Sequence, residues 1–401
     1  MRLFQKLGWA WLLCAGAISA PAQTFQTIAN FSFETGEFPQ YMFLIQGNDG
    51  NFYGTTTYGG DTGVDAGAVF AVTAQGTLTD LYGFCAFGGC TDGGKPYGGL
   101  VQAADSTFYG TTYQGGANGT GTVFELTTGG TESVLYSFCS QTNCADGDDP
   151  FAPLVQATDG NFYGTTLDGG TKGYGTVFAI TSAGTLTTLH SFHYSDGASP
   201  VAGLTQARNG KFYGTTLYGG AHGAGTVFEI SAAGKLKTLH SFGAAGDGAN
   251  PYAVLVQAAD GTFYGTTYSG GTHGQGTVFA ITAAGKLTTL YSFCSAKKCS
   301  DGAAPCAGVI QATDGDFYGT TSQGGASNRG TVFAISAAGK LTSLHSFCLQ
   351  KNCTDGAEPS GGLLQASKGT FYGTTTEGGA NEDGTVFSLS AGLSSQSNGQ
   401  R

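Results

Sequence analysis

The stretch from Leu154 to Phe192 carries the pattern that decides the fold: LVQATDGNFYGTT, then LDGGTKGYG, then TVFAITSAGTLTTLHSF. Its central string FYGTT occurs seven times, at intervals of 50 to 56 residues, beginning at Phe52, Phe108, Phe162, Phe212, Phe263, Phe317 and Phe371. Self-similarity at a nearly fixed period is typical of repeat architectures, in which each unit is one small supersecondary structure. The sequence therefore predicts seven equivalent units.

Each unit is expected to form four short antiparallel strands. Aromatic and β-branched residues dominate the candidate strands, and Asp-Gly or Ala-Gly pairs separate them in the manner of tight hairpin turns. In the third unit the expected strands are Leu154–Ala157, Asn161–Thr166, Thr176–Thr181 and Thr185–Phe192. No unit has room for a crossover helix, so the sheet must be a meander. Four strands in about 50 residues predict an all-β, seven-bladed β-propeller.

The two ends of the repeat region predict how the ring closes. The last unit has three candidate strands, Gly361–Ala366, Thr370–Thr375 and Thr385–Ser390, and only polar residues follow. Near the other end, TFQTIANF (Thr24–Phe31) matches the fourth-strand pattern TLTTLHSF. We expect residues 24–31 to supply the outer strand of the seventh blade and so cover an open sheet edge. The domain assignment is then one propeller over residues 23–393 and a polar tail over 394–401.

Residues 1–22 are predicted to be a cleaved secretory signal peptide. Arg2 and Lys6 precede the apolar run Leu7 to Ile18, and small residues at Ala20 and Ala22 suit a signal peptidase. The apolar run is shorter than the roughly 20 residues of a membrane-spanning helix. The mature chain is expected to be secreted or periplasmic, monomeric and without a membrane span.

Composition excludes several classes of protein. The 401 residues include 70 glycines, which argues against a mainly helical fold because glycine inside a helix costs about 1 kcal/mol. The 16 basic and 27 acidic residues give a net charge of −11, and no cluster of Lys or Arg is present. Nucleic acids and anionic membrane surfaces are therefore poor candidates as partners.

The repeated unit FYGTT…GG…GTVFAIT…G.LT.LYSF resembles the GloVer tandem-repeat family of exported bacterial proteins. The resemblance covers essentially the whole mature chain. It implies export and a repeat architecture, and it brings no activity, catalytic residue or cofactor. Members of the family often carry a C-terminal sorting anchor, whereas this chain ends in polar residues, so we expect free secretion.

The cysteines form four pairs of identical spacing and one remainder. The pairs follow the expected fourth strands, in the longer units, at Cys85/Cys90, Cys139/Cys144, Cys294/Cys299 and Cys348/Cys353. In an oxidising compartment they are expected to form disulfides, each contributing roughly 2 kcal/mol. Zinc held by two pairs on adjacent blades is the alternative. Cys306, which follows Pro305, is expected to be a small buried apolar residue.

Any ligand site is expected on the face that carries the loops after the second and fourth strands, because the other face has only tight turns. Binding sites concentrate on variable loops of a rigid scaffold. The candidates are tyrosines and carboxylates that stand one or two positions after the FYGTT string, where the residue type differs between units. They are Tyr58, Tyr113, Tyr218, Tyr268, Asp168 and Glu377. Tyrosines offer flat apolar faces with a hydroxyl group, which suit sugar rings or a protein partner; rim packing is the alternative.

Features that recur in every unit are expected to belong to the scaffold. A glutamine stands in each first strand, either bonding backbone between blades or lining a channel, at Gln46, Gln102, Gln156, Gln206, Gln257, Gln311 and Gln365. The Asp of an Asp-Gly-x-x-Pro motif is expected to form a turn, and calcium binding is the alternative. This Asp stands at Asp92, Asp146, Asp196, Asp247, Asp301 and Asp355. His190, His240 and His345 alternate with Tyr82, Tyr136 and Tyr291 as expected packing residues. His222 and His273 lack a third metal ligand.

The sequence favours a secreted, non-catalytic binding or surface-interaction protein whose ligand is a glycan or an extracellular protein, with no cofactor and no metal. The alternative is a polysaccharide- or lactone-directed hydrolase or lyase with its site at the channel mouth. A glycosidase needs two carboxyl groups roughly 5–10 Å apart. Asp168 and Glu377 occupy equivalent positions on blades nearly opposite each other, and no catalytic motif is present.

Overall fold

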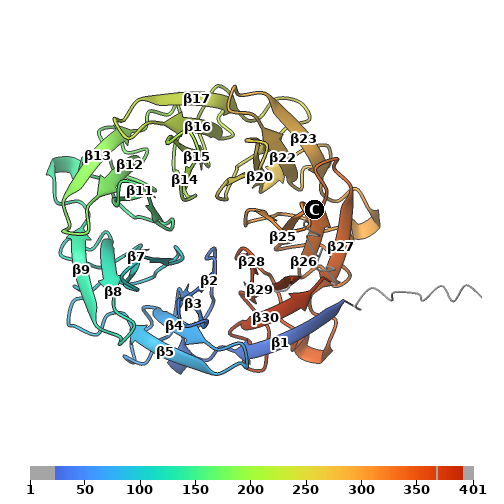
Figure 1. The fold of residues 1–401 in the computed structure, drawn as a ribbon, viewed down its shortest axis with the longest axis horizontal. Helices are drawn as coiled ribbons and strands as arrows, with labels where there is room; N and C mark the ends of the chain where they lie inside the picture. Colours follow the sequence, from blue (N-terminus) through green and yellow to red (C-terminus); the bar gives the residue numbers. More distant parts are fainter. Residues whose placement is uncertain (1–22, 367–368, 392–401) are drawn as a thin grey trace, which may run out of the picture.

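The computed structural model describes residues 23–366 and 369–391, and these form a closed ring of seven four-stranded antiparallel sheets around a central axis (Figure 1). The predicted signal peptide and polar tail lie outside the described residues. The predicted seven-bladed propeller is thus confirmed. This part of the chain contains no helix with the length and hydrophobicity needed to span a membrane.

In blades one to six the strands run in chain order from the axis outward. Blades one to three are β2 (Ile45–Gln46), β3 (Phe52–Thr56), β4 (Ala68–Val72), β5 (Leu78–Gly83); β6 (Val101–Gln102), β7 (Phe108–Thr112), β8 (Thr122–Leu126), β9 (Glu132–Ser137); and β10 (Val155–Gln156), β11 (Phe162–Thr166), β12 (Thr176–Ile180), β13 (Leu186–Ser191). Blades four to six are β14 (Thr205–Gln206), β15 (Phe212–Thr216), β16 (Thr226–Ile230), β17 (Leu236–Ser241); β19 (Val256–Gln257), β20 (Phe263–Thr267), β22 (Thr277–Ile281), β23 (Leu287–Ser292); and β24 (Ile310–Gln311), β25 (Phe317–Thr321), β26 (Thr331–Ile335), β27 (Leu341–Ser346).

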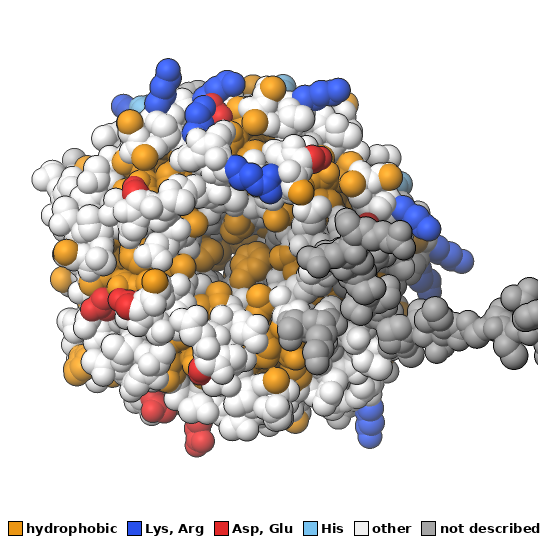
Figure 2. Space-filling model, viewed as in Figure 1, with side chains coloured by type: hydrophobic (Ala, Val, Ile, Leu, Met, Phe, Trp, Pro, Cys, Tyr) orange, Lys and Arg blue, Asp and Glu red, His pale blue; other side chains and the backbone are white. Residues whose placement is uncertain are grey.

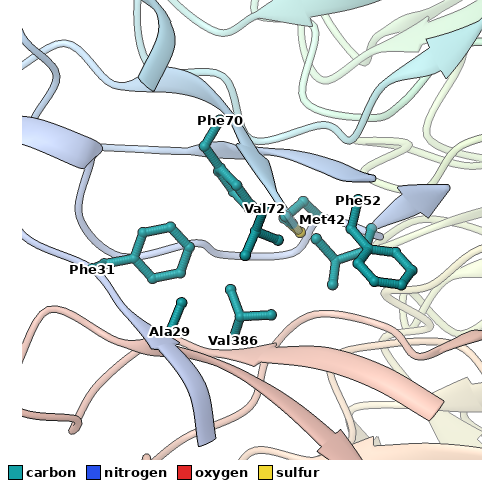
Figure 3. Packing of buried hydrophobic residues seen from close by; sticks show 8 residues of the cluster. Ala29, Phe31, Met42, Phe52, Phe70, Val72 and Val386 are labelled. Carbon is teal, nitrogen blue, oxygen red and sulfur yellow. The ribbon is translucent and has the colours of Figure 1, made fainter. Parts of the chain in front are cut away.

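The seventh blade closes the ring as predicted. Its inner strands are β28 (Leu364–Gln365), β29 (Thr370–Thr375) and β30 (Thr385–Ser390), and β1 (Thr24–Asn30) is its outer strand. β1 pairs antiparallel with β30, from Thr24 opposite Ser390 to Asn30 opposite Thr385. Figure 3 shows Ala29, Phe31 and Val386 of this junction packed against Met42, Phe70 and Val72 of blade one.

The FYGTT string explains why the blades stack. Its Phe and Tyr point to opposite faces of the sheet, so the Tyr of each blade packs on the Phe of the next. The ring-centroid distances are 3.9 to 4.4 Å, and the seventh contact, between Tyr372 and Phe52, joins the last blade to the first. Gly164 is required because a Cβ there would come within 2.6 Å of the Phe178 ring. Seven aromatic contacts of one kind therefore tie the sheets into a ring.

The long loops also contain short elements that the sequence did not predict. Three 3-10 turns lie in disulfide-bonded loops: η2 (Thr142–Cys144), η3 (Lys297–Cys299) and η4 (Lys351–Cys353). A fourth, η1 (Phe33–Thr35), follows β1, and β18 (Gly248–Ala249) pairs with β21 (Ser269–Gly270). All four predicted disulfides are present, Cys85–Cys90, Cys139–Cys144, Cys294–Cys299 and Cys348–Cys353. Cys306 is free and buried, as predicted.

Candidate functional site

A cavity of about 550 Å³ lies off the axis on the face of the long loops. Its walls come from the loops after the second strands of blades four to seven and from the segments that precede the inner strands of blades five, six, seven and one. The lining residues include Gln40, Tyr41, Tyr218, Asn250, Tyr252, Tyr268, Cys306, Gln323, Glu358, Ser360 and Glu377. Its volume falls within the range of about 300–1,000 Å³ that is common for ligand sites.

The cavity exists because one repeated position changes size around the ring. This position follows the proline of each long loop and holds Tyr97, Phe151, Val201, Tyr252, Cys306 and Ser360 in blades two to seven. Blades two, three and five thus place an aromatic ring there. Cys306 and Ser360, in blades six and seven, replace the ring by a small side chain, and both line the cavity.

The first blade departs from the repeat in another way. It has one extra residue between Pro39 and Gln46, and this segment carries Tyr41. The ring of Tyr41 lies 5.0 Å from that of Tyr252 and 5.5 Å from that of Phe151, centroid to centroid. Tyr41 therefore contacts aromatic residues of two other blades across the centre of the ring.

These rings pack against one another at the centre of the propeller. Phe151 stacks on Tyr97 at 4.5 Å, and the pocket left beside Tyr41, Phe151 and Tyr252 measures only about 10 Å³. The space-filling view shows hydrophobic side chains inside the hollow at the ring centre (Figure 2). Tyr41 and Tyr252 line both this small pocket and the larger cavity, so a ligand in the larger cavity would contact their rings.

The same backbone kink precedes the proline of the long loop in every blade. The residue before the proline has a φ of 52 to 56° in all seven blades: Phe38, Lys95, Asp149, Ser199, Asn250, Ala304 and Glu358. Left-handed backbone is unusual for these residue types and is disfavoured in front of proline. The kink lets residues on both sides of a proline reach the cavity: Asn250 and Tyr252 both line it, as do Glu358 and Ser360.

Two carboxylates share one guanidinium at the edge of the cavity. Arg329 Nη1 donates to Glu358 Oε1 at 2.6 Å and to Glu377 Oε2 at 3.0 Å. These three groups carry a net charge of −1 when ionised. Both carboxylates therefore act as hydrogen-bond acceptors at the cavity edge.

The buried groups that line the cavity are held in their neutral forms. Burial raises the pKa of the Cys306 thiol to about 11, with a further rise from Glu358 and an opposing hydrogen bond with Ser322. Burial likewise raises the pKa of Tyr41 to about 12. Near neutral pH, the cavity therefore offers a thiol and phenolic hydroxyl groups rather than thiolate or phenolate nucleophiles.

The structure brings together half of the candidate residues from the sequence. Tyr218, Tyr268 and Glu377 line the cavity, and the two tyrosines are 47% and 38% exposed. Tyr58 does not line it and lies beneath the Lys95 ammonium group, 3.5 Å from the ring centroid. Tyr113 lies outside the cavity too, with its ring edge-on to Tyr97 at 5.5 Å.

Asp168 belongs to a separate acidic group in blade three. It pairs through its backbone with Asp148, and Asp149 lies next to Tyr113. Burial, together with Asp148, raises the pKa of Asp149 to about 7. Within residues 23–366 and 369–391, no group of three or more His, Cys, Asp or Glu side chains is arranged to hold a metal ion.

The repeated polar residues serve the scaffold. Side chains of the inner glutamines accept from a backbone N–H of the preceding blade, as Gln102 does from Asn48 and Gln206 from Thr158. Each Asp of the Asp-Gly-x-x-Pro motif faces the Tyr or His of the preceding fourth strand, as in Tyr136 to Asp146 at 2.7 Å and His190 to Asp196 at 3.0 Å. His190 and His240 thus bond to a partner as well as pack.

Sequence reasoning missed most of the cavity lining. Tyr41, Tyr252, Glu358 and Ser360 were not candidates, and Cys306 was considered only as a core residue. The signal that identifies them is the variation of the two residues around each proline, because a ring of repeats is expected to keep its scaffold positions constant.

The model of the Gloeobacter/Verrucomicrobia repeat matches residues 17–209, 136–299 and 294–397, which together span nearly the whole chain. A comparison with curated proteins yields no match. Among solved structures, the chain is similar to two proteins described as extracellular domains of a hybrid two-component and a one-component system of B. thetaiotaomicron, at 12% and 8% identity and TM-scores of 0.59 and 0.56. It also resembles PorZ, a surface component of the type-IX secretion system of Porphyromonas gingivalis, at 16% identity and a TM-score of 0.55.

These similarities support the fold. They cover 90–91% of this chain but only 40–48% of these three structures, so the chain spans less than half the length of each of them. At such low identity, a shared propeller says nothing about a shared ligand.

Proposed function

Since the chain belongs to the family of the Gloeobacter/Verrucomicrobia repeat, and its repeats build a rigid propeller with an asymmetric cavity, we propose that it is an exported, non-catalytic binding protein that holds a carbohydrate. The observation that carries this proposal is the loss of the aromatic ring at Cys306 and Ser360. Scaffold positions repeat, whereas this one varies: Val201, Cys306 and Ser360 replace the ring in blades four, six and seven, and the last two line the cavity.

The chemistry of the lining favours a sugar. Tyr41, Tyr252 and Tyr268 provide flat faces for the C–H groups of a pyranose ring. The amides of Gln40 and Gln323 and the carboxylates of Glu358 and Glu377 supply the hydrogen-bonding groups that vicinal hydroxyls require. A concave site of this kind suits a small ring better than the flat surface that most protein partners present.

The same groups support binding over hydrolysis. A glycosidase needs one carboxyl group that stays protonated to donate to the leaving oxygen. Both carboxylates at the cavity accept from the same Arg329 Nη1, so each is engaged as an acceptor and neither stands alone as a proton donor for a leaving group. The proposed protein therefore retains its ligand without cleaving it.

The test is retention of neutral polysaccharides in native affinity electrophoresis, with a β-1,3-glucan, a β-1,4-xylan, a galactomannan and an α-1,4-glucan as probes. We expect at least one to retard the protein without release of reducing ends. The variant Cys306→Phe, which copies Phe151 of blade three, should fill the cavity and lower affinity at least tenfold. Tyr268→Ala, at an exposed side chain, should weaken retention without any risk to the core.

The matched control is Phe87→Ala, which removes a 61% exposed ring from the disulfide loop of blade one on the same face. It should bind as the unaltered protein does. Retention by none of the four polysaccharides would overturn the proposal, and released product would favour the hydrolase alternative. Retention that survives both Cys306→Phe and Tyr268→Ala would show that the cavity is not the site.

A further inference from the structure

Three exposed tyrosines lead outward from the cavity. Tyr218 lines the cavity and is 47% exposed, while Tyr174 and Tyr194 lie beyond it at 38% and 48%. Single exposed aromatic side chains such as Phe87 are normal, whereas several that lie together mark interaction sites. We refer to these three residues as the tyrosine track.

Backbone hydrogen bonds fix the order of the track. Ala198 N donates to Tyr218 O at 2.9 Å, and the next residue, Ser199, donates to Tyr174 O at 3.0 Å. Tyr218 and Tyr174 therefore flank the same two-residue segment. The Tyr174 and Tyr194 rings lie 5.6 Å apart, centroid to centroid. Tyr218 thus connects the cavity to an aromatic pair at the junction of blades three and four.

The position of Tyr194 is special in the repeat. It lies in the loop after β13, which has no cysteine pair, and the corresponding loops of four other blades hold the disulfides. Tyr194 O accepts from Gly220 N of blade four at 2.8 Å. A tyrosine anchored through its backbone has an ordered position while its ring stays open to solvent.

The aromatic rings at the axis and the charge of the cavity restrict the ligand further. A chain does not pass between Tyr41, Phe151 and Tyr252 at the axis, because their ring centroids lie only 5.0 to 6.2 Å apart. Glu358 and Glu377 outnumber Arg329, so an anionic sugar such as a uronate would be repelled. A chain that enters the cavity must end there or turn back toward solvent.

Building on the proposed function, we infer that the ligand is a neutral polysaccharide whose terminal units occupy the cavity and whose following units lie over the tyrosine track. Successive sugar rings stack on Tyr218, Tyr174 and Tyr194 as the chain leaves toward blades three and four. The site is then an extended one, and affinity rises with the length of the chain.

The test compares a disaccharide with a long oligosaccharide of whichever probe polysaccharide is retained, by isothermal titration calorimetry. The long oligosaccharide should bind more tightly, and Tyr174→Ala and Tyr194→Ala should each lower its affinity roughly three- to tenfold, as loss of one aromatic contact would. The disaccharide should bind these variants normally. Tyr194→Phe should retain the long ligand, and Phe87→Ala is again the control.

The outcomes separate the two proposals. Equal affinity for both lengths, or normal binding of the long ligand by Tyr174→Ala and Tyr194→Ala while Cys306→Phe still abolishes it, would overturn the track and leave the cavity as the site. A loss of equal size in Phe87→Ala would also overturn it. Absence of binding by every probe would instead reject the proposed function itself.

Discussion

At the scale of single residues, Asp146 shows that a residue typical of turns can hold a whole loop. Its side chain is fully buried and accepts from the Tyr136 hydroxyl and the backbone N–H groups of Ser140 and Gln141, at 2.7 to 3.1 Å. Burial alone raises the pKa of Asp146, but hydrogen bonds from Tyr136, Ser140 and Gln141 outweigh it and hold the pKa below its usual value of 3.8. The ionised carboxylate is therefore part of the native structure.

Asp146→Asn is expected to lower the free energy of unfolding by about 2 kcal/mol at pH 7, because an amide cannot replace all the acceptor contacts. The lowered pKa means that the unfolded chain takes up the proton first as pH falls. The contribution is complete above about pH 4 and disappears in more acidic solution, so the two proteins should converge there. Urea unfolding at several pH values measures this, with the exposed Glu34→Gln as control; a difference that persists unchanged at pH 2 would contradict it.

The residue scale is also where prediction from sequence was weakest. The repeated Gln and Asp residues could be assigned to the scaffold because the Gln recurs in all seven blades and the Asp in six of the seven long loops. Cys306 and Ser360 could not be recognised as cavity residues, because their effect comes from the ring they lack and from Tyr41, which reaches them from the other end of the chain. The missing aromatic ring can be recognised as a cavity only when the arrangement of all seven blades is known.

At the scale of strands and loops, the junction of blades one and two contains an unfavourable pair of carboxyl groups. Glu132 begins β9, and Asp92 lies in the loop after β5; each has a buried oxygen without a hydrogen-bond partner in the described structure, Glu132 Oε1 and Asp92 Oδ1. Burial, followed by the charge of Asp92, raises the pKa of Glu132 to about 7. Tyr82 lies between them and donates to Asp92 at 2.8 Å.

We expect Glu132→Gln to stabilise the protein by about 1 kcal/mol at pH 8, or roughly 2 °C in Tm, since it removes a charge and supplies a donor for Asp92. The raised pKa means that the folded protein loses stability as pH rises from about 4.5 to 7. The gain should therefore vanish at pH 5, where Glu132 carries its own proton. Calorimetry at pH 5 and pH 8 measures the Tm of both proteins, with Glu382→Gln in blade seven as the control variant. Equal gains in Tm at the two pH values would show that Glu132 and Asp92 do not interact.

Strands were more predictable than the loops between them. Residues such as Phe162 and Tyr163 must face opposite sides of a sheet, and the Asp-Gly turns define where each hairpin begins, so the strand bounds differ from those expected by only a few residues. The kink before each proline could not be foreseen. Local preference disfavours a left-handed residue such as Glu358 there, and only packing of the whole ring overrides that preference.

At the scale of the molecule, stability depends on how the ring is closed. β1 covers the outer edge of β30, and Phe31, which follows it, is completely buried against Phe70 of blade one at a centroid distance of 4.9 Å. This closure was predictable because TFQTIANF repeats the pattern of six other outer strands. Removal of residues 23–31 should cost more than the about 3–5 kcal/mol of a single buried Phe→Ala, a large part of the stability of any domain.

A circular permutant tests whether that loss comes from the missing strand. Blade six shows what linker is needed. There Ile335 lies opposite Leu341, and Ala-Ala-Gly joins the residues that follow and precede them, Ser336 and Lys340. In blade seven Leu389 lies opposite Phe25 in the same way, so Ala-Ala-Gly between Ser390 and Thr24, in a chain that starts at Ser32, should recreate an ordinary blade. We expect the permutant to melt near the temperature of the original protein and the truncated chain to melt far below it or not to fold, as followed by circular dichroism. A truncated chain as stable as the original would mean that six complete blades and a partial seventh hold the ring without β1, whereas an unfolded permutant would show that closure requires the native chain order as well as the strand itself.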